Sequence, residues 1–140
     1  MVLGTIMKII LNTDGGARGN PGPSGIGVVL KDEAGKLLKA QGEYIGTATN
    51  NEAEYKALIL GLKLASELKA VEILVRMDSE LIVRQMQGVY KIKDEKLKKL
   101  AQEVFGLGNN FKNIVFVHVP REKNSEADAL VNEAIDKAIK

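Results

Sequence analysis

Residues 49–78, TNNEAEYKALILGLKLASELKAVEILVRMD, join a helix to a strand, and this junction decides the fold. Small and apolar side chains recur at helical spacing along residues 51–69, at Ala57, Leu58, Gly61, Ala65 and Leu68. Residues 71–77 are rich in apolar and β-branched side chains, which is typical of a strand. Since crossovers through a helix are right-handed, we expect this strand to return to the sheet parallel to an earlier one.

Further strands and helices are predicted on both sides of this junction. Three extended segments precede it, at residues 6–13, 25–32 and 37–45, and their short links predict antiparallel pairing. After it come a short helix, a lysine-rich helix, a strand and a last helix, over residues 79–87, about 94–105, 114–119 and 125–139. The sequence therefore predicts an α/β fold, with a mixed five-stranded sheet of three antiparallel and then two parallel strands, and helices packed on both faces.

The composition indicates one globular domain over residues 1–140, with residues 1–5 as a loose N-terminal extension. Of the 140 residues, 45% are hydrophobic and 27% are charged, which excludes a disordered or fibrous chain. The lack of cysteine excludes thiolate metal sites and a cysteine nucleophile. No apolar run approaches the roughly 20 residues that cross a membrane, and the N-terminus lacks a secretory signal pattern. We therefore expect a cytoplasmic protein with no membrane partner and no obligate protein partner.

Positive charge is concentrated in residues 84–99, which we call the basic segment. It holds Asp94 and Glu95 but six basic residues, which are Arg84, Lys91, Lys93, Lys96, Lys98 and Lys99. Such a segment is either a solvated helix face or a contact for nucleic acid. Only a catalytic site nearby would favour the second interpretation.

Two aspartates follow strands that we expect to be parallel neighbours. Asp14 ends the first strand and begins a glycine-rich loop, and Asp78 ends the strand at residues 71–77. Taken alone, Asp14 is typical of a turn and Asp78 of a helix cap. Because parallel neighbours end at the same edge of a sheet, where open α/β sheets bind ligands, we expect these carboxylates to meet there.

Two more carboxylates lie on predicted helices. Glu54 lies within about 40° of the apolar stripe of its helix, whereas Glu52 points the opposite way and can form a capping box with Thr49. A capping box with Asn51 is the alternative for Glu54, but because Thr49 and Glu52 can form an equally good box, we favour Glu54 as a ligand. Asp128 lies in the first turn of the last helix, where a capping box with Ser125 is the alternative.

Carboxylates gathered at one sheet edge repel one another unless cations neutralise them. Oxygen ligands suit Mg²⁺ or Mn²⁺, while the lack of cysteine and the single histidine argue against zinc. Two such ions, about 3.5–4 Å apart, are the usual arrangement for in-line displacement at phosphorus. The carboxylates therefore point to metal-dependent phosphoryl chemistry.

Four sequence blocks, in this order, resemble type 1 ribonuclease H from Ile6 to about Ile139. They are Thr13-Asp14-Gly15-Gly16 with Gly19-Asn20-Pro21-Gly22-Pro23, then Thr49-Asn50-Asn51-Glu52-Ala53-Glu54, then Met77-Asp78-Ser79, and then Ala127-Asp128. The resemblance implies a ribonuclease H-like fold and an endonuclease that hydrolyses the RNA strand of an RNA–DNA hybrid. It also implies products with 3′-hydroxyl and 5′-phosphate ends.

The resemblance assigns roles to individual residues. It implies a catalytic tetrad that holds two Mg²⁺ ions, formed by Asp14, Glu54, Asp78 and Asp128. It implies contacts with the minor groove of the hybrid, where 2′-hydroxyls distinguish RNA from DNA, by Asn20, Asn50 and Asn51. It also implies that Thr49 helps to hold a phosphate of the DNA strand. Lys91, Lys93 and Lys96 of the basic segment are further substrate-binding candidates.

Two features resemble the compact archaeal-type branch of the family. The chain has no tryptophan, so it lacks the tryptophan-rich basic handle of the better-known bacterial enzymes. Those enzymes carry a catalytic loop histidine ten residues before the last aspartate, and His118 keeps this spacing but falls in a predicted strand. Arg121, in the short link that follows, is therefore the better candidate to reach the scissile phosphate.

Two functions other than that of a nuclease are alternatives for this sequence. A nucleotide-binding protein is disfavoured because neither G-x-G-x-x-G nor G-x-x-x-x-G-K-[ST] occurs, and the glycine-rich loop leads into a strand. A catalytically inactive module of the same fold that binds hybrids or double-stranded RNA is the remaining alternative. Since all four carboxylates are present, the sequence favours the enzyme, and double-stranded RNA is a second candidate substrate.

Overall fold

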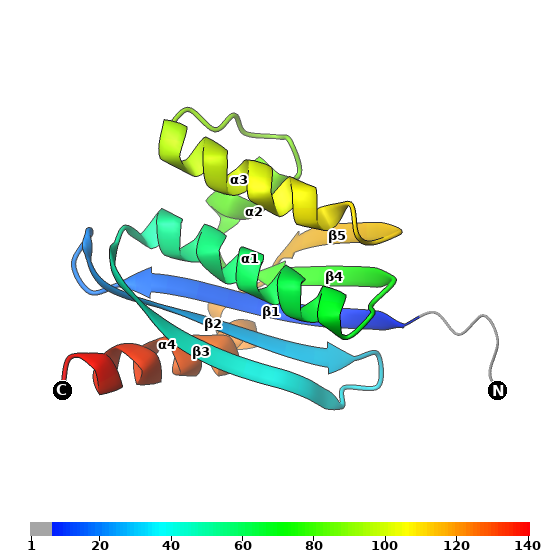
Figure 1. Ribbon diagram of the computed structural model, residues 1–140, viewed down its shortest axis with the longest axis horizontal. Coiled ribbons are helices and arrows are strands. Elements are labelled where there is room, and N and C mark those ends of the chain that lie inside the picture. Colours follow the sequence, from blue (N-terminus) through cyan, green and yellow to red (C-terminus); the bar gives the residue numbers. More distant parts are fainter. Residues whose placement is uncertain (1–6) are drawn as a thin grey trace.

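The computed structural model describes residues 7–140 as a five-stranded sheet with helices on both faces (Figure 1). The strands are β1 (Lys8–Ala17), β2 (Gly22–Asp32), β3 (Leu37–Ala48), β4 (Glu72–Met77) and β5 (Asn113–His118). The helices are α1 (Asn50–Glu67), α2 (Glu80–Met86), α3 (Glu95–Gly108) and α4 (Ser125–Ala138), and a 3₁₀ turn, η1 (Arg121–Asn124), precedes α4. The extension expected at residues 1–5 lies outside the described residues.

The strand order is β3-β2-β1-β4-β5, with β1 at the centre. Strand β2 pairs antiparallel with both β1 and β3. Strand β4 pairs parallel with both β1 and β5, because α1 carries the chain back across the sheet before β4 begins. The predicted order of three antiparallel and two parallel strands is therefore confirmed.

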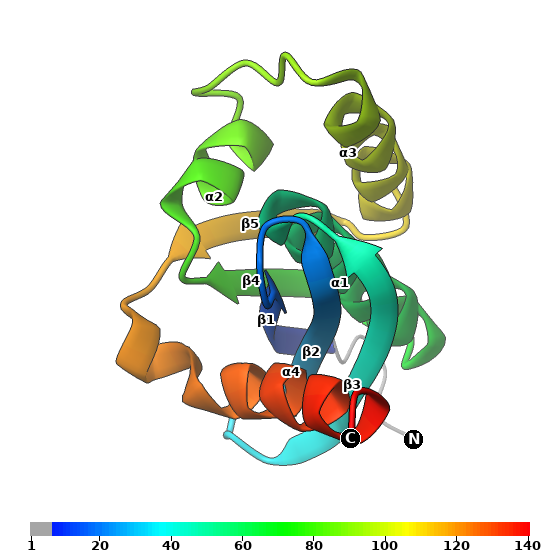
Figure 2. The same ribbon diagram turned by 90° about the vertical axis from the view of Figure 1, so that its left-hand side faces the viewer.

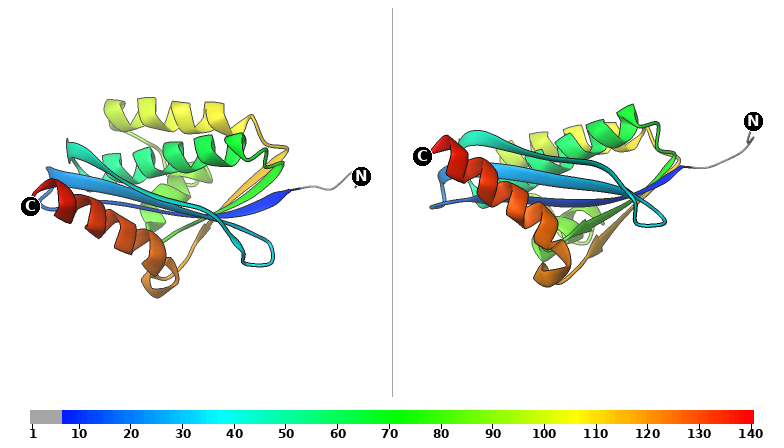
Figure 3. Two further views of the ribbon diagram at one scale, coloured as in Figure 1. Left: turned by 60° about the horizontal axis from the view of Figure 1, so that its bottom comes forward. Right: turned by 90° about the horizontal axis from the view of Figure 1, so that it is seen from below.

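The helices divide between the two faces of the sheet. Helices α1, α2 and α3 lie on one face, and α4 lies on the other (Figures 1 and 3). The predicted stripe of α1 faces the sheet, since Leu58 and Ala65 are fully buried and Gly61 lies directly over Leu11 of β1. Helix α3 packs on α1, so the larger core lies on this face. Within residues 7–140, no helix has both the length and the apolar character needed to cross a membrane.

Strand β1 differs from the prediction in its length. The sequence suggested a strand that ends near Asp14 and then a glycine-rich loop, but β1 continues to Ala17 and pairs with β2. The physical reason is the close approach of α1. A Cβ atom on Gly15 would lie 2.3 Å from the backbone carbonyl carbon of Ala53, so only glycine lets the helix pack against the strand. Gly15 thus serves the packing of α1 on β1.

Candidate active site

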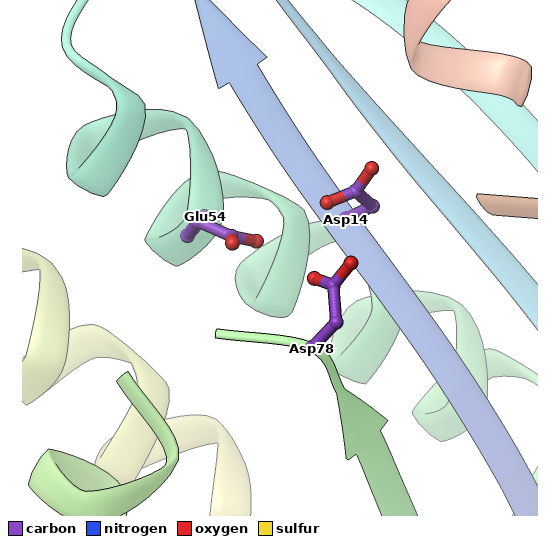
Figure 4. Close-up of side chains that lie close together, drawn as sticks. All are labelled: Asp14, Glu54 and Asp78. Carbon is purple, nitrogen blue, oxygen red and sulfur yellow. The ribbon is translucent and has the colours of Figure 1, made fainter. Parts of the chain in front are cut away.

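Three carboxylates converge at one edge of the sheet (Figure 4). Asp14 lies in β1, Glu54 in α1 and Asp78 directly after β4. One carboxylate oxygen from each of them lies within 4.8 Å of the other two. Asp14 and Glu54 are 7% and 8% exposed, and Asp78 is half-buried. The convergence that the parallel pairing of β1 and β4 predicted is therefore present in the structure.

The start of α1 explains why Glu54 and not Glu52 joins this cluster. The Glu52 amide donates to Thr49 Oγ1 at 3.2 Å, and the Thr49 amide donates to Glu52 Oε1 at 3.2 Å. This is the predicted capping box, which satisfies the free amides of the first turn. Glu54, one half-turn further on, faces the sheet and accepts a 3.0 Å hydrogen bond from the Gly15 amide.

Asp78 is likewise free of a capping role. The helix that follows it is capped by Ser79, whose Oγ accepts from the Ile82 amide at 3.4 Å. The parallel pairing of β1 with β4 ends at Asn12 and Arg76, so the two strands separate just before their aspartates. This separation leaves room for both carboxylates at the sheet edge.

Asp128 borders the same site from the opposite face of the sheet. Together with the three converging carboxylates it lines a cleft of about 530 Å³, and its proximity helps to raise the pKa of Asp14. The capping box with Ser125 is not formed, since α4 begins without a side-chain cap. Asp128 lies outside the tight group of three, and its Oδ2 accepts a 3.4 Å hydrogen bond from Asn132.

Burial and mutual repulsion raise the pKa values of these acids. Burial, aided by the charges of Asp78 and Asp128, raises the pKa of Asp14 to about 8. Burial and the charges of Asp14 and Asp78 raise the pKa of Glu54 well above its usual range. Burial also raises the pKa of Asp78, against opposing effects that include the charge of Arg121. Carboxylates held together at such a cost are typical of a functional site.

The donor set fits a hard divalent cation. All three converging side chains offer carboxylate oxygens, which are the ligands that such cations prefer. A cation there would offset the repulsion that raises their pKa values. The cluster is therefore a candidate metal site.

The two auxiliary candidates lie in different surroundings. Arg121 begins η1, is exposed, and lines the cleft with the carboxylates. His118 ends β5, so it lies in a strand as predicted; it is paired with Met77 and does not line the cleft. The structure thus brings Arg121, and not His118, to the acidic site.

Three of the four substrate candidates around the start of α1 make hydrogen bonds within the protein. The Asn50 amide donates to Asn20 Oδ1 at 3.0 Å, and Asn50 Oδ1 accepts from the Ala17 amide at 2.8 Å. Thr49 caps α1, and Asn51 is half-buried in its first turn. These contacts hold the turn between β1 and β2 against the helix that carries Glu54.

The basic segment borders this region. Lys91 and Lys93 are exposed in the loop between α2 and α3. Figure 2 shows this loop above the sheet. Lys96, in the first turn of α3, lies with its Nζ 3.4 Å from Glu52 Oε2. Since Glu52 belongs to the first turn of α1, this ion pair places the start of the basic helix beside the start of the helix that holds Glu54.

Sequence analysis missed one residue of this region, Asn124. The sequence predicts only a short link at this position, but Asn124 is 1% exposed and donates to the Thr13 carbonyl at 2.9 Å. A second contact, at 3.0 Å, comes from Asn12 Nδ2 to Asn124 Oδ1. No local pattern marks this residue, because its partners lie more than a hundred residues away.

Comparison with known proteins gives consistent similarities over almost the whole chain. A family model described as reverse transcriptase-like matches residues 12–134. A bifunctional protein of Mycobacterium tuberculosis is 46% identical over 133 residues, which are 94% of this chain and 36% of that protein. The chain thus spans about a third of the length of this relative and of two further mycobacterial ones.

Two other similarities extend over the full length of both chains. A ribonuclease H of Paracidovorax citrulli is 32% identical, and the match covers 94% of this chain and 97% of that one. The crystal structure of LC11-RNase H1 in complex with an RNA/DNA hybrid is 57% identical, with a TM-score of 0.91. That match covers 94% of this chain and 99% of the other.

Proposed function

Because the chain belongs to the type 1 ribonuclease H family, we propose that it is an endonuclease that hydrolyses the RNA strand of RNA–DNA hybrids. The observation that carries this proposal is the convergence of Asp14, Glu54 and Asp78 in one cleft. The products would carry 3′-hydroxyl and 5′-phosphate ends. We also propose that residues 1–140 act as one domain, while a cytoplasmic location stays a prediction.

We propose that the site holds two Mg²⁺ ions, which Mn²⁺ can replace, through Asp14, Glu54, Asp78 and Asp128. When bound, such ions activate a water molecule and stabilise the leaving oxygen. The protein contributes the negative charge and its placement. Glu54 is oriented by the Gly15 amide, and Asp128 lines the same cleft as Asp14. Arg121, at the rim, would bind a phosphate oxygen of the substrate.

Substrate recognition is proposed at the start of α1. In the described part of the chain, Asn20 and Asn50 use their Oδ1 atoms as acceptors, and no hydrogen bond uses their Nδ2 groups. These Nδ2 groups can donate to 2′-hydroxyl and base acceptors in the minor groove, where RNA differs from DNA. Asn51 and Thr49 lie in the same first turn and extend this surface.

A cleavage assay tests the proposal. A hybrid with a labelled RNA strand is incubated with the protein and Mg²⁺, and the ends of the products are identified. Cleavage of the RNA strand with 5′-phosphate ends would support the enzyme. Tight binding without cleavage would instead support the alternative, an inactive hybrid-binding module. A parallel reaction with double-stranded RNA shows whether that substrate is also cut.

We predict that the basic segment makes the affinity for hybrid depend on salt. Each phosphate contact releases counterions, which adds roughly 0.7–0.9 to the slope of log Kd against log salt concentration. Replacing Lys96, Lys98 and Lys99 together with glutamine should therefore flatten this slope. Fluorescence anisotropy with a labelled, uncleavable hybrid at several salt concentrations measures the effect.

Three exposed lysines on other parts of the surface, Lys36, Lys39 and Lys112, provide a control of equal charge. Their replacement changes the net charge by the same amount but leaves the basic segment intact. An equal slope change in both triple variants would show that only the net charge matters, and the basic segment would then be a solvated helix face.

We predict that Arg121 supports turnover more than His118 does. Arg121 lines the acidic cleft, whereas His118 lies outside it at the end of β5. A guanidinium stays protonated and can bind a phosphate oxygen in the transition state. Arg121→Ala should therefore lower kcat by roughly 10- to 100-fold, and His118→Ala by less than about threefold.

Both variants are compared at saturating Mg²⁺, with folding checked by circular dichroism. The pH dependence of kcat provides a second measure, because a histidine that transfers protons makes the rate depend on its protonation state. If folded His118→Ala loses far more kcat than Arg121→Ala, the histidine mechanism of the bacterial enzymes applies here.

A further inference from the structure

Two side-chain amides, the half-buried Asn12 and the buried Asn124, connect the centre of the sheet to the turn before α4. Asn12 lies in β1, and Asn124 is the last residue of η1. Asn12 Nδ2 donates to Asn124 Oδ1 at 3.0 Å, and Asn124 Nδ2 donates to the Thr13 carbonyl at 2.9 Å. Asn12 Nδ2 also reaches the Lys123 carbonyl at 3.3 Å. Asn124 is therefore hydrogen-bonded to β1 as both donor and acceptor.

The turn that contains Asn124, and the helix α4 that follows it, begin without a side-chain cap. Neither η1 nor α4 begins with a side-chain hydrogen bond to a free amide. Most helix starts gain such a bond from the residue before them, as α1, α2 and α3 do here. The start of α4 is instead fixed by a tertiary contact, which holds it at one position along β1.

This contact lies among the acidic residues of the site. Thr13, whose carbonyl accepts from Asn124, directly precedes Asp14. The Asn124 side chain also lies close enough to Asp78 to oppose the rise in the pKa of that carboxyl. On either side of Asn124, Arg121 begins the turn and Asp128 lies in the first turn of α4. Asn124 thus contacts β1, lies close to Asp78, and belongs to the segment that contains Arg121 and Asp128.

We propose that Asn124 is a positioning residue: its amide sets where Arg121, Asp78 and Asp128 stand relative to Asp14. This inference rests on the proposed function. A residue with one donor and one acceptor at this geometry is required, since the Thr13 carbonyl must be met by a donor and Asn12 Nδ2 by an acceptor. Aspartate would keep the acceptor, lose the donor and add another negative charge beside the three converging carboxylates.

The test compares Asn124→Ala with the wild type in two assays. Loss of a group that orients metal ligands typically lowers metal affinity or activity by about 10- to 100-fold. We expect kcat to fall within that range while KM for the hybrid changes by less than about threefold. In the second assay, without substrate, Mg²⁺ is titrated against the Tm of the protein. The Mg²⁺ concentration for half of the maximal Tm shift should rise by about tenfold.

Gln85→Leu is the matched control. Gln85 is also a buried polar residue, 8% exposed, and it accepts a 2.6 Å hydrogen bond from Tyr55 Oη. Its replacement should lower the Tm but leave kcat and the Mg²⁺ midpoint within about twofold of the wild type. This separates a loss of positioning from a general loss of stability.

Asn12→Ala keeps the test decisive if Asn124→Ala does not fold. It removes only the outer amide of the pair, so we expect a smaller change in the same direction, about three- to tenfold in kcat and in the Mg²⁺ midpoint. The inference is overturned if folded Asn124→Ala, or Asn12→Ala in its place, matches Gln85→Leu in both assays. Because the Mg²⁺ titration contains no substrate, a wild type that binds Mg²⁺ but cuts no hybrid would overturn the proposed activity alone.

Discussion

Glu54→Gln is expected to abolish cleavage of the hybrid, whereas Glu52→Gln retains most of it. Glu54 is buried and its carboxylate faces Asp14 and Asp78. Glutamine keeps the shape and can still accept from the Gly15 amide, but it lacks the charge that a metal ligand must supply. We expect kcat to fall by at least about 10³-fold, which corresponds to roughly 4 kcal/mol of transition-state stabilisation.

Glu52 is a closely matched control for this prediction. It lies two residues earlier on the same helix, but its carboxylate caps the helix and pairs with Lys96. Glutamine is also suitable at this position of a capping box, so the helix start should survive the change. Single-turnover assays and thermal denaturation of both variants measure activity and folding. Comparable losses of activity in the two variants would disprove the assignment of Glu54 as a ligand.

Asp14→Asn is expected to make the metal-free protein more stable at alkaline pH. The pKa of Asp14 is raised to about 8 by burial and by the neighbouring carboxylates. A raised pKa means that the folded state holds the proton more tightly than the unfolded state does. The stability from this proton is fully present below about pH 4 and is lost as the pH rises through about 8.

Asparagine at position 14 cannot ionise and avoids this loss. Each unit of pKa shift corresponds to roughly 1.4 kcal/mol, but the substitution also alters the interaction of position 14 with Asp128. We therefore expect Asp14→Asn to be about 2–4 kcal/mol more stable than the wild type at about pH 8.5, with little difference at about pH 4. Urea denaturation in the presence of a chelator at both pH values measures the difference.

Mg²⁺ should have the opposite effect on the stability of Asp14→Asn relative to that of the wild type. A ligand that binds only the folded state stabilises it in proportion to its affinity, and Asp14→Asn removes a proposed ligand. Added Mg²⁺ should thus raise the Tm of the wild type more than that of the variant. Glu43→Gln, at an exposed carboxylate of β3, controls for the change in net charge. A less stable Asp14→Asn at alkaline pH, without metal, would contradict the repulsion on which the metal site is proposed.

The predictions for Glu54 and Asp14 concern residues whose positions in the fold could be predicted from the sequence. The stripe of α1 and the capping box of Thr49 and Glu52 depend on spacing within one helix, and both are confirmed. The meeting of Asp14 and Asp78 followed from the handedness of crossovers, which holds for almost every parallel pair of strands. Periodicity and chain topology are local or general rules, so they need no knowledge of tertiary packing.

Other features depended on contacts that no such rule describes. β1 runs through Gly15 because α1 packs against it, although Gly-Gly after an aspartate is typical of a turn. The predicted alternative for Asp128, a capping box with Ser125, is absent because Asn124 secures the start of α4 through β1. The raised pKa of Asp14 likewise arises from burial and from carboxylates on other elements.

The amino-acid sequence by itself therefore determined the number of strands and the directions in which they pair, the family and the residues that could form the site. Periodic side-chain patterns and crossover handedness are sufficient for these, because each is encoded within one element or one connection. Only the tertiary structure decided how closely the carboxylates approach and which neutral residue holds them. Asn124 and Thr13 are 111 residues apart, and their hydrogen bond exists only because packing of the whole sheet and α4 brings them together.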